Sequence, residues 1–325
     1  MTNFIPKQVF PLFELIFLGT SASAPSLRRG LSAHMVKHNE HRFLIDCGEG
    51  TQRQILKSGL GFKRLNHILI THGHLDHILG LAGLFSTFSR WETLEEIEIL
   101  AGQWALDRID ALLYGVRIVP KGKASNLKLS LIPIQAGPII EMDDFTISAF
   151  PVSHRGPDCF GYLFEEKERR PFLPEKADEL GVPVGPVRRK LVAGEAITLE
   201  DGRRVEPEDV LGEALPGTRY AHVGDTGRTD NILPHIKGVD ALVIEATYLE
   251  EEAQMAKDFA HLTAGQAAQL AKDAGVGQLI LTHISRRYRE ADVIAEAQAV
   301  FPNTRVARDF DVYQIKRGET IKVEG

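Results

Sequence analysis

The 325-residue sequence has little cysteine, no excess of basic charge and no long apolar run. Its two cysteines, Cys47 and Cys159, lie far apart, so no disulfide framework is indicated and a reducing compartment is favoured. The formal net charge of −6 argues against a protein that coats nucleic acid through overall basicity. Pro6, Pro11 and Glu14 interrupt the apolar N-terminus, so we predict neither a signal peptide nor a membrane span. We therefore expect a cytoplasmic protein.

Short β-branched runs alternate with helical patterns, which is typical of an α/β protein. Strands are expected at 14–19, 42–48, 67–71, 96–102, 127–134, 145–153, 159–166, 219–226, 241–247 and 278–285. Apolar residues with helical spacing lie at 49–59 and 77–90. The clearest helix spans 263–275, where Thr263 suits the N-cap and Gly275 the C-terminal stop.

The segment 165–217 breaks this alternation. It is charged, rich in Pro and Gly, and contains GVPVGP (181–186), RRK (188–190) and LEDGR (199–203). A stretch of this length without a clear core element is usually functional or disordered. Composition alone slightly favours a solvated surface insertion.

The sequence THGHLDH (71–77) concentrates titratable groups behind the apolar run HILI. Its side chains His72, His74, Asp76 and His77 form the pattern H-x-H-x-D-H. Neutral imidazole and carboxylate groups are ligands of zinc and related divalent ions. Incidental histidines on a solvated loop are the alternative, but this density of ligand types behind a strand favours a metal site.

Three later strand ends supply candidate partners for the motif, namely His154, Asp225 and His283. Each one alone is more often a turn or core-edge residue than a ligand. Together with the motif they would complete two sites that share one carboxylate. That arrangement suits a two-metal hydrolase, which activates water at neutral pH. The ligand set is compatible with zinc and also with manganese or iron.

On these residues the sequence resembles the metallo-β-lactamase superfamily, whose ordered signature is H-x-H-x-D-H followed by His, Asp and His. Within it, the chain is similar to ribonuclease Z, the endonuclease family that trims the 3′ trailer from precursor tRNA and leaves a 3′-hydroxyl. The closer resemblance rests on LGTSASAP (18–25), FLIDCGEGTQRQ (43–54), GVPVGP, LEDGR, VGDT (223–226), EAT (245–247), HLTAGQAA (261–268) and LTHISRRY (281–288).

The resemblance implies one αββα sandwich over residues 1–325, with two mixed β-sheets face to face, helices outside and the metals at one edge. The segment 165–217 is then similar to the flexible arm with which the family grips the body of precursor tRNA. A homodimer is implied as well, in which the arm of one subunit serves the active site of the other.

The resemblance also assigns metal ligands. It implies two zinc ions, one held by His72, His74 and His154, the other by Asp76, His77 and His283, with Asp225 bridging them. Asp76 would in addition accept a proton from the attacking water.

Glu245 and His261 match the family pair implicated in assisting departure of the ribose 3′ oxygen, with the carboxylate orienting the imidazole. Without the resemblance, Glu245 would be interpreted as a surface carboxylate at a strand end and His261 as an exposed residue before a helix. Asp46 is a candidate partner of a metal-bound histidine, or a cap of the helix that begins near Glu49.

Two sets of residues are candidates for binding RNA. Ser285 and Arg287 follow a predicted ligand and would donate hydrogen bonds to the scissile phosphate, although a surface loop is the ordinary place for such an arginine. In the arm, backbone amides around Gly185, together with Pro186 and the basic residues Arg188, Arg189 and Lys190, would contact tRNA. Such contacts recognise the shape and backbone of a helical RNA, but a charge run is usually a solvated face.

The sequence departs from the family pattern at three places. Where the family shows P-x-K-x-R-N, this chain has PSLRRG, with Leu27 for Lys and Gly30 for Asn. Ile244 replaces His before Glu-Ala-Thr, and HLT replaces H-S-T. These changes leave open where the cut falls relative to the discriminator base or CCA.

Three other functions compete with tRNA processing. A small-molecule phosphodiesterase or arylsulfatase-like hydrolase would keep every ligand but has no use for the GVPVGP insertion. A non-catalytic RNA-binding protein would not need the full ligand set. A thiolester or β-lactam hydrolase is formally possible, because function resides in the site and not in the fold.

Overall fold

The computed structural model describes residues 12–91, 94–115 and 127–323. The chain divides into two units, here called the body, which runs to Glu165 and resumes at Thr218, and the arm, Glu166–Gly217. Among the described residues, every helix is too short or too polar to cross a membrane.

The first sheet of the body has the order β17-β16-β1-β2-β3-β4-β5-β6. Pairing is parallel from β3 to β6 and antiparallel elsewhere. Its strands are β1 (Phe13–Gly19), β2 (Ala33–His38), β3 (His41–Ile45), β4 (His67–Leu69), β5 (Glu96–Ala101), β6 (Lys128–Pro133), β16 (Val312–Lys316) and β17 (Glu319–Val323).

The second sheet has the order β15-β14-β13-β12-β9-β8-β7, and its strands β12 to β15 are parallel. Its strands are β7 (Gly137–Glu141), β8 (Phe145–Val152), β9 (Cys159–Glu166), β12 (Arg219–His222), β13 (Ala241–Glu245), β14 (Gln278–Thr282) and β15 (Thr304–Val306). Every strand expected from the sequence is present, whereas β2, β7 and β15 to β17 were not predicted.

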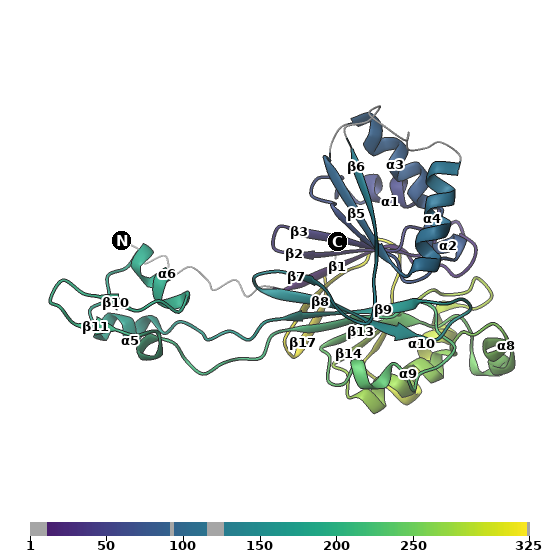
Figure 1. Cartoon of the computed structure of the whole chain (residues 1–325). Coiled ribbons are helices and arrows are strands. Elements are labelled where there is room, and N and C mark those ends of the chain that lie inside the picture. The colour runs from purple at the N-terminus through teal and green to yellow at the C-terminus, as the bar shows by residue number, and fades with distance from the viewer. Residues whose placement is uncertain (1–11, 92–93, 116–126, 324–325) are drawn as a thin grey trace. The chain divides into compact units, whose positions relative to one another are not determined.

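Helices lie on the outer face of each sheet (Figure 1). The first sheet carries α1 (Thr51–Lys57), α2 (Leu75–Ile78), α3 (Gly80–Trp91) and α4 (Gln103–Gly115). The second carries α9 (Ala264–Ala274) and α10 (Glu290–Val300), and the connections of this half include η1 (Leu233–His235), η2 (Glu250–Glu252) and α8 (Ala253–Asp258).

Alternation along the buried strands explains the layers, because successive side chains of a strand point to opposite faces. In β1, Leu15 and Phe17 belong to the cluster between the sheets, while Ile16 and Leu18 pack with the helices of the first sheet. β13 does the same, with Val243 inside and its neighbours beneath α9. The predicted αββα sandwich is confirmed.

Helix α9 has the predicted ends. Thr263 Oγ1 accepts a hydrogen bond from Gln266 N at 3.1 Å, and the Gln266 side chain accepts one from Thr263 N at 3.0 Å. Gly275 stops the helix with φ 64, a left-handed conformation that favours glycine. Removing the cap by Thr263→Ala would cost about 1 kcal/mol.

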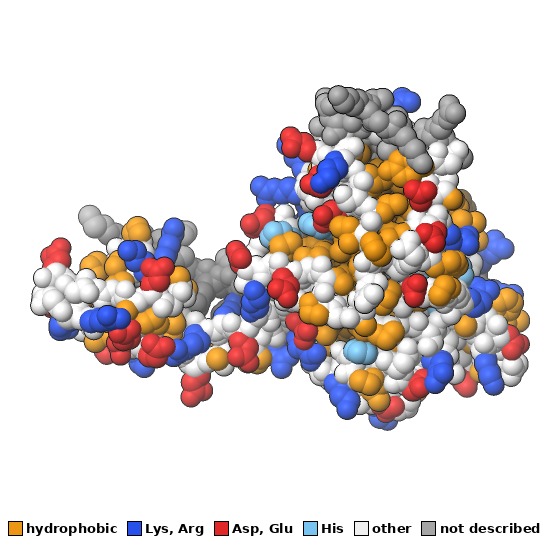
Figure 2. Space-filling model, in the orientation of Figure 1, with side chains coloured by type: hydrophobic (Ala, Val, Ile, Leu, Met, Phe, Trp, Pro, Cys, Tyr) orange, Lys and Arg blue, Asp and Glu red, His pale blue; other side chains and the backbone are white. Residues whose placement is uncertain are grey.

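The arm has secondary structure and a small core of its own, contrary to the expectation of a segment without core elements. It contains α5 (Pro174–Glu179), α6 (Pro186–Val192), β10 (Ile197–Thr198), β11 (Arg204–Val205) and α7 (Pro207–Val210). The buried residues of this core are Ala177, Val182, Leu191, Ile197, Val205 and Val210. Basic and acidic side chains are interspersed on the face of the arm seen in Figure 2. The arm joins the body at a hairpin, because Glu165 of β9 is the register partner of Arg219 of β12.

Candidate metal centre

Loops at one edge of the two sheets bring together the seven predicted ligands. His72 and His74 lie between β4 and α2, and Asp76 and His77 lie on α2. The other three each follow a strand of the second sheet: His154 follows β8, Asp225 follows β12 and His283 follows β14. The residues form two groups whose ligand atoms lie within 4.8 Å of one another.

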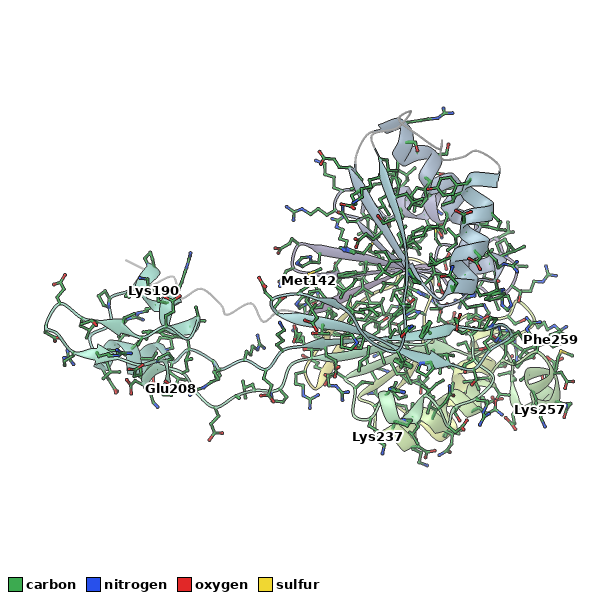
Figure 3. All side chains as sticks on the ribbon, viewed as in Figure 1. Met142, Lys190, Glu208, Lys237, Lys257 and Phe259 are labelled. Carbon is green, nitrogen blue, oxygen red and sulfur yellow. The ribbon has the colours of Figure 1, made fainter. Side chains whose placement is uncertain are left out.

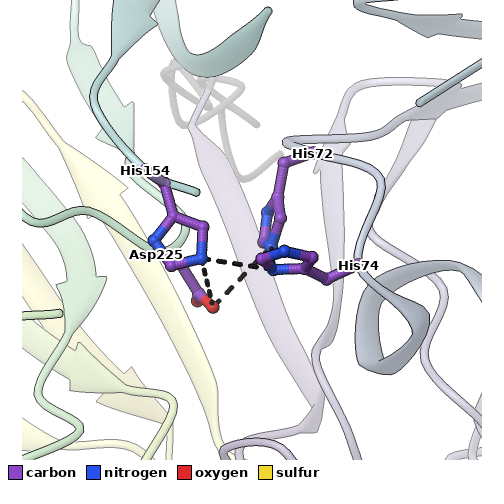
Figure 4. Close-up of side chains that lie close together, drawn as sticks. All are labelled: His72, His74, His154 and Asp225. Carbon is purple, nitrogen blue, oxygen red and sulfur yellow. Dashed lines mark hydrogen bonds and ion pairs between the residues drawn. The ribbon is translucent and has the colours of Figure 1, made fainter. Parts of the chain in front are cut away.

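The first group consists of His72, His74, His154 and Asp225 (Figure 4). Nδ1 of His74 lies 2.9 Å from Nε2 of His72 and 3.2 Å from Nε2 of His154. Oδ2 of Asp225 lies 3.7 Å from Nε2 of His72 and 3.8 Å from Nε2 of His154. Two ligands of a tetrahedral zinc ion are separated by about 3.3 Å, so these distances match a tetrahedral site.

The second group consists of Asp76, His77, His283 and the same Asp225. Nε2 of His77 lies 3.5 Å from Asp225 Oδ2 and 3.8 Å from Asp76 Oδ2. Nε2 of His283 lies 3.3 Å from Asp225 Oδ1 and 3.5 Å from Asp76 Oδ2. Asp225 therefore presents oxygens to both groups.

Three buried polar atoms of the second group indicate whether its residues fit a metal ion. Nε2 of His77, Nε2 of His283 and Oδ1 of Asp225 make no hydrogen bond with any described residue. Buried polar atoms are normally paired, since desolvation of an unpaired one is costly. All three point at the second group, so its residues fit a divalent cation.

Hydrogen bonds fix which nitrogen of His77 and His72 faces the groups. Nδ1–H of His77 donates to Asp46 Oδ2 at 2.7 Å. Asp46 also accepts from the amide and hydroxyl of Thr71, so the Thr71 oxygen is left to accept from Nδ1–H of His72 at 3.1 Å. Asp46 is thus a partner of a candidate ligand, and its alternative role as a cap is wrong, because Gly50 is the N-cap of α1.

His154 and His283 are oriented in the same way. Nδ1–H of His154 donates to the carbonyl of Ala260 at 2.7 Å. Nδ1–H of His283 donates to Thr247 Oγ1 at 2.9 Å, while the Thr247 hydroxyl donates to Glu245. These contacts leave the lone pair of each Nε2 directed at the centre, as metal-bound histidines require.

Three residues at the same place have a strained backbone conformation. Asp46, Ala260 and His283 have φ of 57, 54 and 55, in the left-handed region that non-glycine residues rarely adopt. Such residues cost about 1–3 kcal/mol each and persist where the surroundings over-determine them. All three support or supply a candidate ligand.

The electrostatics of the two groups differ. Burial lowers the pKa of His72 and of His154, and it lowers the pKa of His74 to about 4, so these imidazoles are neutral at pH 7. Burial opposes protonation of His77 too, but the carboxylates of Asp225, Asp46 and Asp76 outweigh it and hold its pKa well above the ordinary value. His77 therefore keeps a proton in the metal-free protein.

Both carboxylates of the second group are held ionised. Burial favours their neutral forms, but His283 and His77 keep the pKa of Asp225 well below its ordinary value. His77 and His283 likewise lower the pKa of Asp76. Ionised carboxylates are the form that a metal ion binds.

Glu245 and His261 form a buried pair beside the centre, which excludes the surface positions that their sequence context alone predicts. Nδ1–H of His261 donates to Glu245 at 2.9 Å, and Thr226 N donates to the same carboxylate at 2.7 Å. Burial lowers the pKa of His261, but Glu245 outweighs it and raises that pKa to about 9. The ring lies 5.0 Å from that of His154 and 5.6 Å from that of His283, adjacent to both groups.

Ser285 and Arg287 differ in their surroundings. Ser285 lines a pocket of about 580 Å³, and Arg28, Arg286 and Arg289 line the same pocket. Arg287 is directed elsewhere, because its guanidinium pairs with Glu252 at 3.0 Å. The pocket arginines were not proposed from the sequence, since nothing in their spacing links positions 28 and 286.

The basic cluster of the arm divides into two kinds of residue. Arg188 is a structural residue: it pairs with Asp178 and donates to the carbonyl of Val182 at 2.7 Å. Arg189 and Lys190 are exposed and have no ion pair among the residues described. Figure 3 labels the Lys190 side chain on the arm. Gly185 is the N-cap of α6 with φ 141, and Pro186 is its first residue.

The departures from the family pattern occupy different environments. Leu27 is fully exposed, whereas Arg29 is held by Glu290 at 2.8 Å and by the carbonyl of Ala307 at 2.6 Å. Gly30 N donates to Asp309. Ile244 is buried in the core beneath α9, where an imidazole would lack the apolar contacts of isoleucine.

Two family models match the sequence. One is described as Anti-Pycsar protein Apyc1 and matches residues 13–171. The other, a beta-lactamase superfamily domain, matches residues 182–284.

Known proteins match nearly the whole chain. A ribonuclease Z from Bradyrhizobium sp. (strain ORS 278) is 47% identical over 92% of this chain and 99% of its own length. The crystal structure of human tRNase Z, short form, is 26% identical with a TM-score of 0.62, covering 92% of this chain and 98% of the other. The metallo-beta-lactamase fold protein YhfI from Bacillus subtilis has a TM-score of 0.65 at 17% identity, covers 93% and 99% of the two chains, and supports the fold alone. The chain therefore belongs to the ribonuclease Z family of the metallo-β-lactamase superfamily.

Proposed function

We propose that the protein is a zinc-dependent endoribonuclease that removes the 3′ trailer from precursor tRNA and leaves a 3′-hydroxyl. The observation that carries this proposal is the pair of ligand groups sharing Asp225, adjacent to the buried Glu245–His261 pair. Its relatives in the ribonuclease Z family support the same reaction.

The first group and the second group are proposed to hold one divalent ion each, with Asp225 shared between them. Ions bound there would polarise the scissile phosphate and supply a nucleophilic water at neutral pH. The chain supplies the orientation: Asp46, Thr71, Thr247 and the Ala260 carbonyl hold four imidazoles with Nε2 inward. Manganese or iron would also suit these ligands.

The chain also supplies groups that move protons. Asp76 is kept ionised by His77 and His283, and we assign it the role of accepting a proton from the attacking water. His261 carries a proton at neutral pH because of Glu245. With Nδ1 engaged by Glu245, His261 would donate from Nε2 to the departing ribose 3′ oxygen.

The arm is proposed to grip the body of the tRNA. Arg189, Lys190 and the exposed turn at Gly185 and Pro186 are the candidate contacts, because Arg188 is used within the arm. Cations on a surface of mixed charge contact the phosphate backbone without reading base sequence. Cytoplasmic location and the homodimer stay predictions, and light scattering of the purified protein tests the second.

Cleavage of an end-labelled, 3′-extended precursor tRNA tests the function. The metal-loaded protein should make a single cut near the acceptor end, and Asp225→Ala, which removes the oxygens shared by both groups, should abolish it. The position of that cut also answers what the PSLRRG loop leaves open. No cut, together with turnover of a small phosphodiester, would favour a small-molecule phosphodiesterase instead.

A further inference from the structure

His74 is held differently from the other candidate histidine ligands. His72, His77, His154 and His283 each donate from Nδ1 to a fixed acceptor. His74 faces the first group with Nδ1, and no described residue accepts a hydrogen bond from its Nε2. The ring is only partly buried, so something else must restrict its rotation.

The side chain that contacts His74 from the outside is Trp104. It lies in the first turn of α4, and its ring centroid is 5.6 Å from that of His74 with an interplanar angle of 84°. An edge-to-face arrangement of this kind is the favoured geometry of aromatic pairs. We propose that Trp104 is a positioning residue for His74 and substitutes for the hydrogen bond that the other ligands have; this rests on the proposed metal site.

Two glycines let the indole approach both loops of the first group. A Cβ on Gly73, next to His74, would lie 3.1 Å from Cε3 of Trp104. A Cβ on Gly156, two residues after His154, would lie 2.7 Å from Cζ3 of the same ring, closer than real Cβ atoms come. Trp104 therefore packs directly on the chain segments that carry His74 and His154, and it ties the two ligands together.

The indole and the helix that carries it make further contacts. The guanidinium of Arg108, one turn further along α4, lies 5.3 Å from the centre of the Trp104 ring, within the range of a cation–π contact. Gly102, immediately before α4, packs so closely on Asp158 that a Cβ on the glycine would lie 2.1 Å from the Asp158 carbonyl oxygen. The helix that presents Trp104 is thus anchored to the loop that follows His154.

These contacts predict a selective effect. Trp104 contacts His74 of the first group, whereas His77 and His283 of the second group have their own hydrogen-bond partners. Loss of a group that orients a metal ligand typically weakens metal affinity about 10- to 100-fold. We expect Trp104→Ala to weaken one of two zinc sites by that factor and to leave the other unchanged.

The test is a zinc titration of the full-length metal-free protein against a chelator of known affinity, with bound metal counted in parallel. Trp104→Leu keeps apolar volume without an aromatic edge and should behave as Trp104→Ala, whereas Trp104→Phe should restore most of the affinity. Asp107→Ala, an exposed change on the same helix, is the matched control and should bind like the unaltered protein. Circular dichroism and melting of the metal-free variants show that each is folded.

The outcomes separate the two proposals. The positioning role is overturned if folded Trp104→Ala and Trp104→Leu bind zinc at both sites as tightly as the unaltered protein does. It is also overturned if the two sites lose affinity equally. If the unaltered protein binds no zinc, manganese or iron, the metal centre itself is overturned.

Discussion

Nδ1 of His261 lies 2.9 Å from Oε1 of Glu245, and both side chains are buried beside the two ligand groups. A buried imidazole paired with a carboxylate keeps its proton above the pH at which a free histidine loses it. The pair is therefore charged under the conditions in which a leaving group needs a proton.

The pH dependence of the reaction should reveal this pair. The pKa of His261 is raised to about 9, so the protonated form is present below that pH and is lost as pH rises through it. Cleavage of RNA should fall over the same range. Turnover of a phosphodiester with a nitrophenolate leaving group should not, because that group departs without a proton. His261→Gln should lower the rate of RNA cleavage about 10²- to 10⁴-fold and the rate of hydrolysis of the chromogenic ester much less. Equal reductions of both rates would contradict the assignment.

Thr247 links the proton-donating pair to a candidate ligand, since it accepts from His283 and donates to Glu245. Thr247→Val keeps the shape of the side chain and removes both hydrogen bonds. We expect affinity for one zinc ion to fall about 10- to 100-fold, measured by chelator competition. Thr247→Ser keeps the hydroxyl and should bind nearly as the unaltered protein does. Full affinity in Thr247→Val would show that packing alone orients His283.

Metal uptake should release a proton. Asp225, Asp46 and Asp76 outweigh burial and keep His77 protonated in the metal-free protein, yet its Nε2 must be deprotonated to bind a cation. His74 has a pKa of about 4 and releases none at pH 7. Calorimetry of zinc binding in buffers of different ionisation enthalpy measures the number released, and affinity should rise with pH. Asp46→Asn removes one of the carboxylates that keep His77 protonated, so this variant should release fewer protons when it binds zinc.

The basic cluster of the arm contains two exposed cations, Arg189 and Lys190, and one cation, Arg188, that is bound within the arm itself. Replacing Arg189 and Lys190 by alanine should weaken binding of precursor tRNA. It should also reduce the slope of log affinity against log salt concentration by about one unit per cation. Hydrolysis of a small phosphodiester should be unchanged. Arg188→Ala should instead loosen the arm, because Arg188 pairs with Asp178 and with the Val182 carbonyl. Proteolysis of the arm distinguishes the two variants, and an unchanged salt dependence for the double variant would remove these cations from the interface.

The candidate ligands could be predicted from sequence because four of them lie within the motif THGHLDH behind an apolar run, and His154, Asp225 and His283 lie at the ends of predicted strands, where a histidine or aspartate is conspicuous. The residues that orient them could not. Thr71 and Thr247 lie within motifs that the sequence displays, but a threonine at a strand end has no feature that distinguishes a partner of histidine from an ordinary turn residue. Trp104 acts through glycines at 73 and 156, a contact that only the folded chain creates.

The core of the arm was missed for a related reason. Val182, Leu191 and Val205 are buried there, but they lie singly among prolines, glycines and charges, with no period of two or of 3.6. Short elements held by a few scattered apolar residues give no periodic signal. Sequence alone does not distinguish Arg188 from its basic neighbours, because its partners lie six and ten residues away.

The junction between body and arm has a consequence for how this enzyme family can diversify. Glu165 and Arg219 are neighbours in an antiparallel pair and are joined by an ion pair of 2.8 Å, so the sheet requires only that the chain return to the same place. The entropy of closing a loop rises slowly, by about 0.6 kcal/mol for each doubling of its length. Segments of different size and surface can therefore be exchanged between these two residues with little effect on the stability of the sheet, so the proposed tRNA contacts of the arm can change without disturbing the strands that carry the candidate ligands.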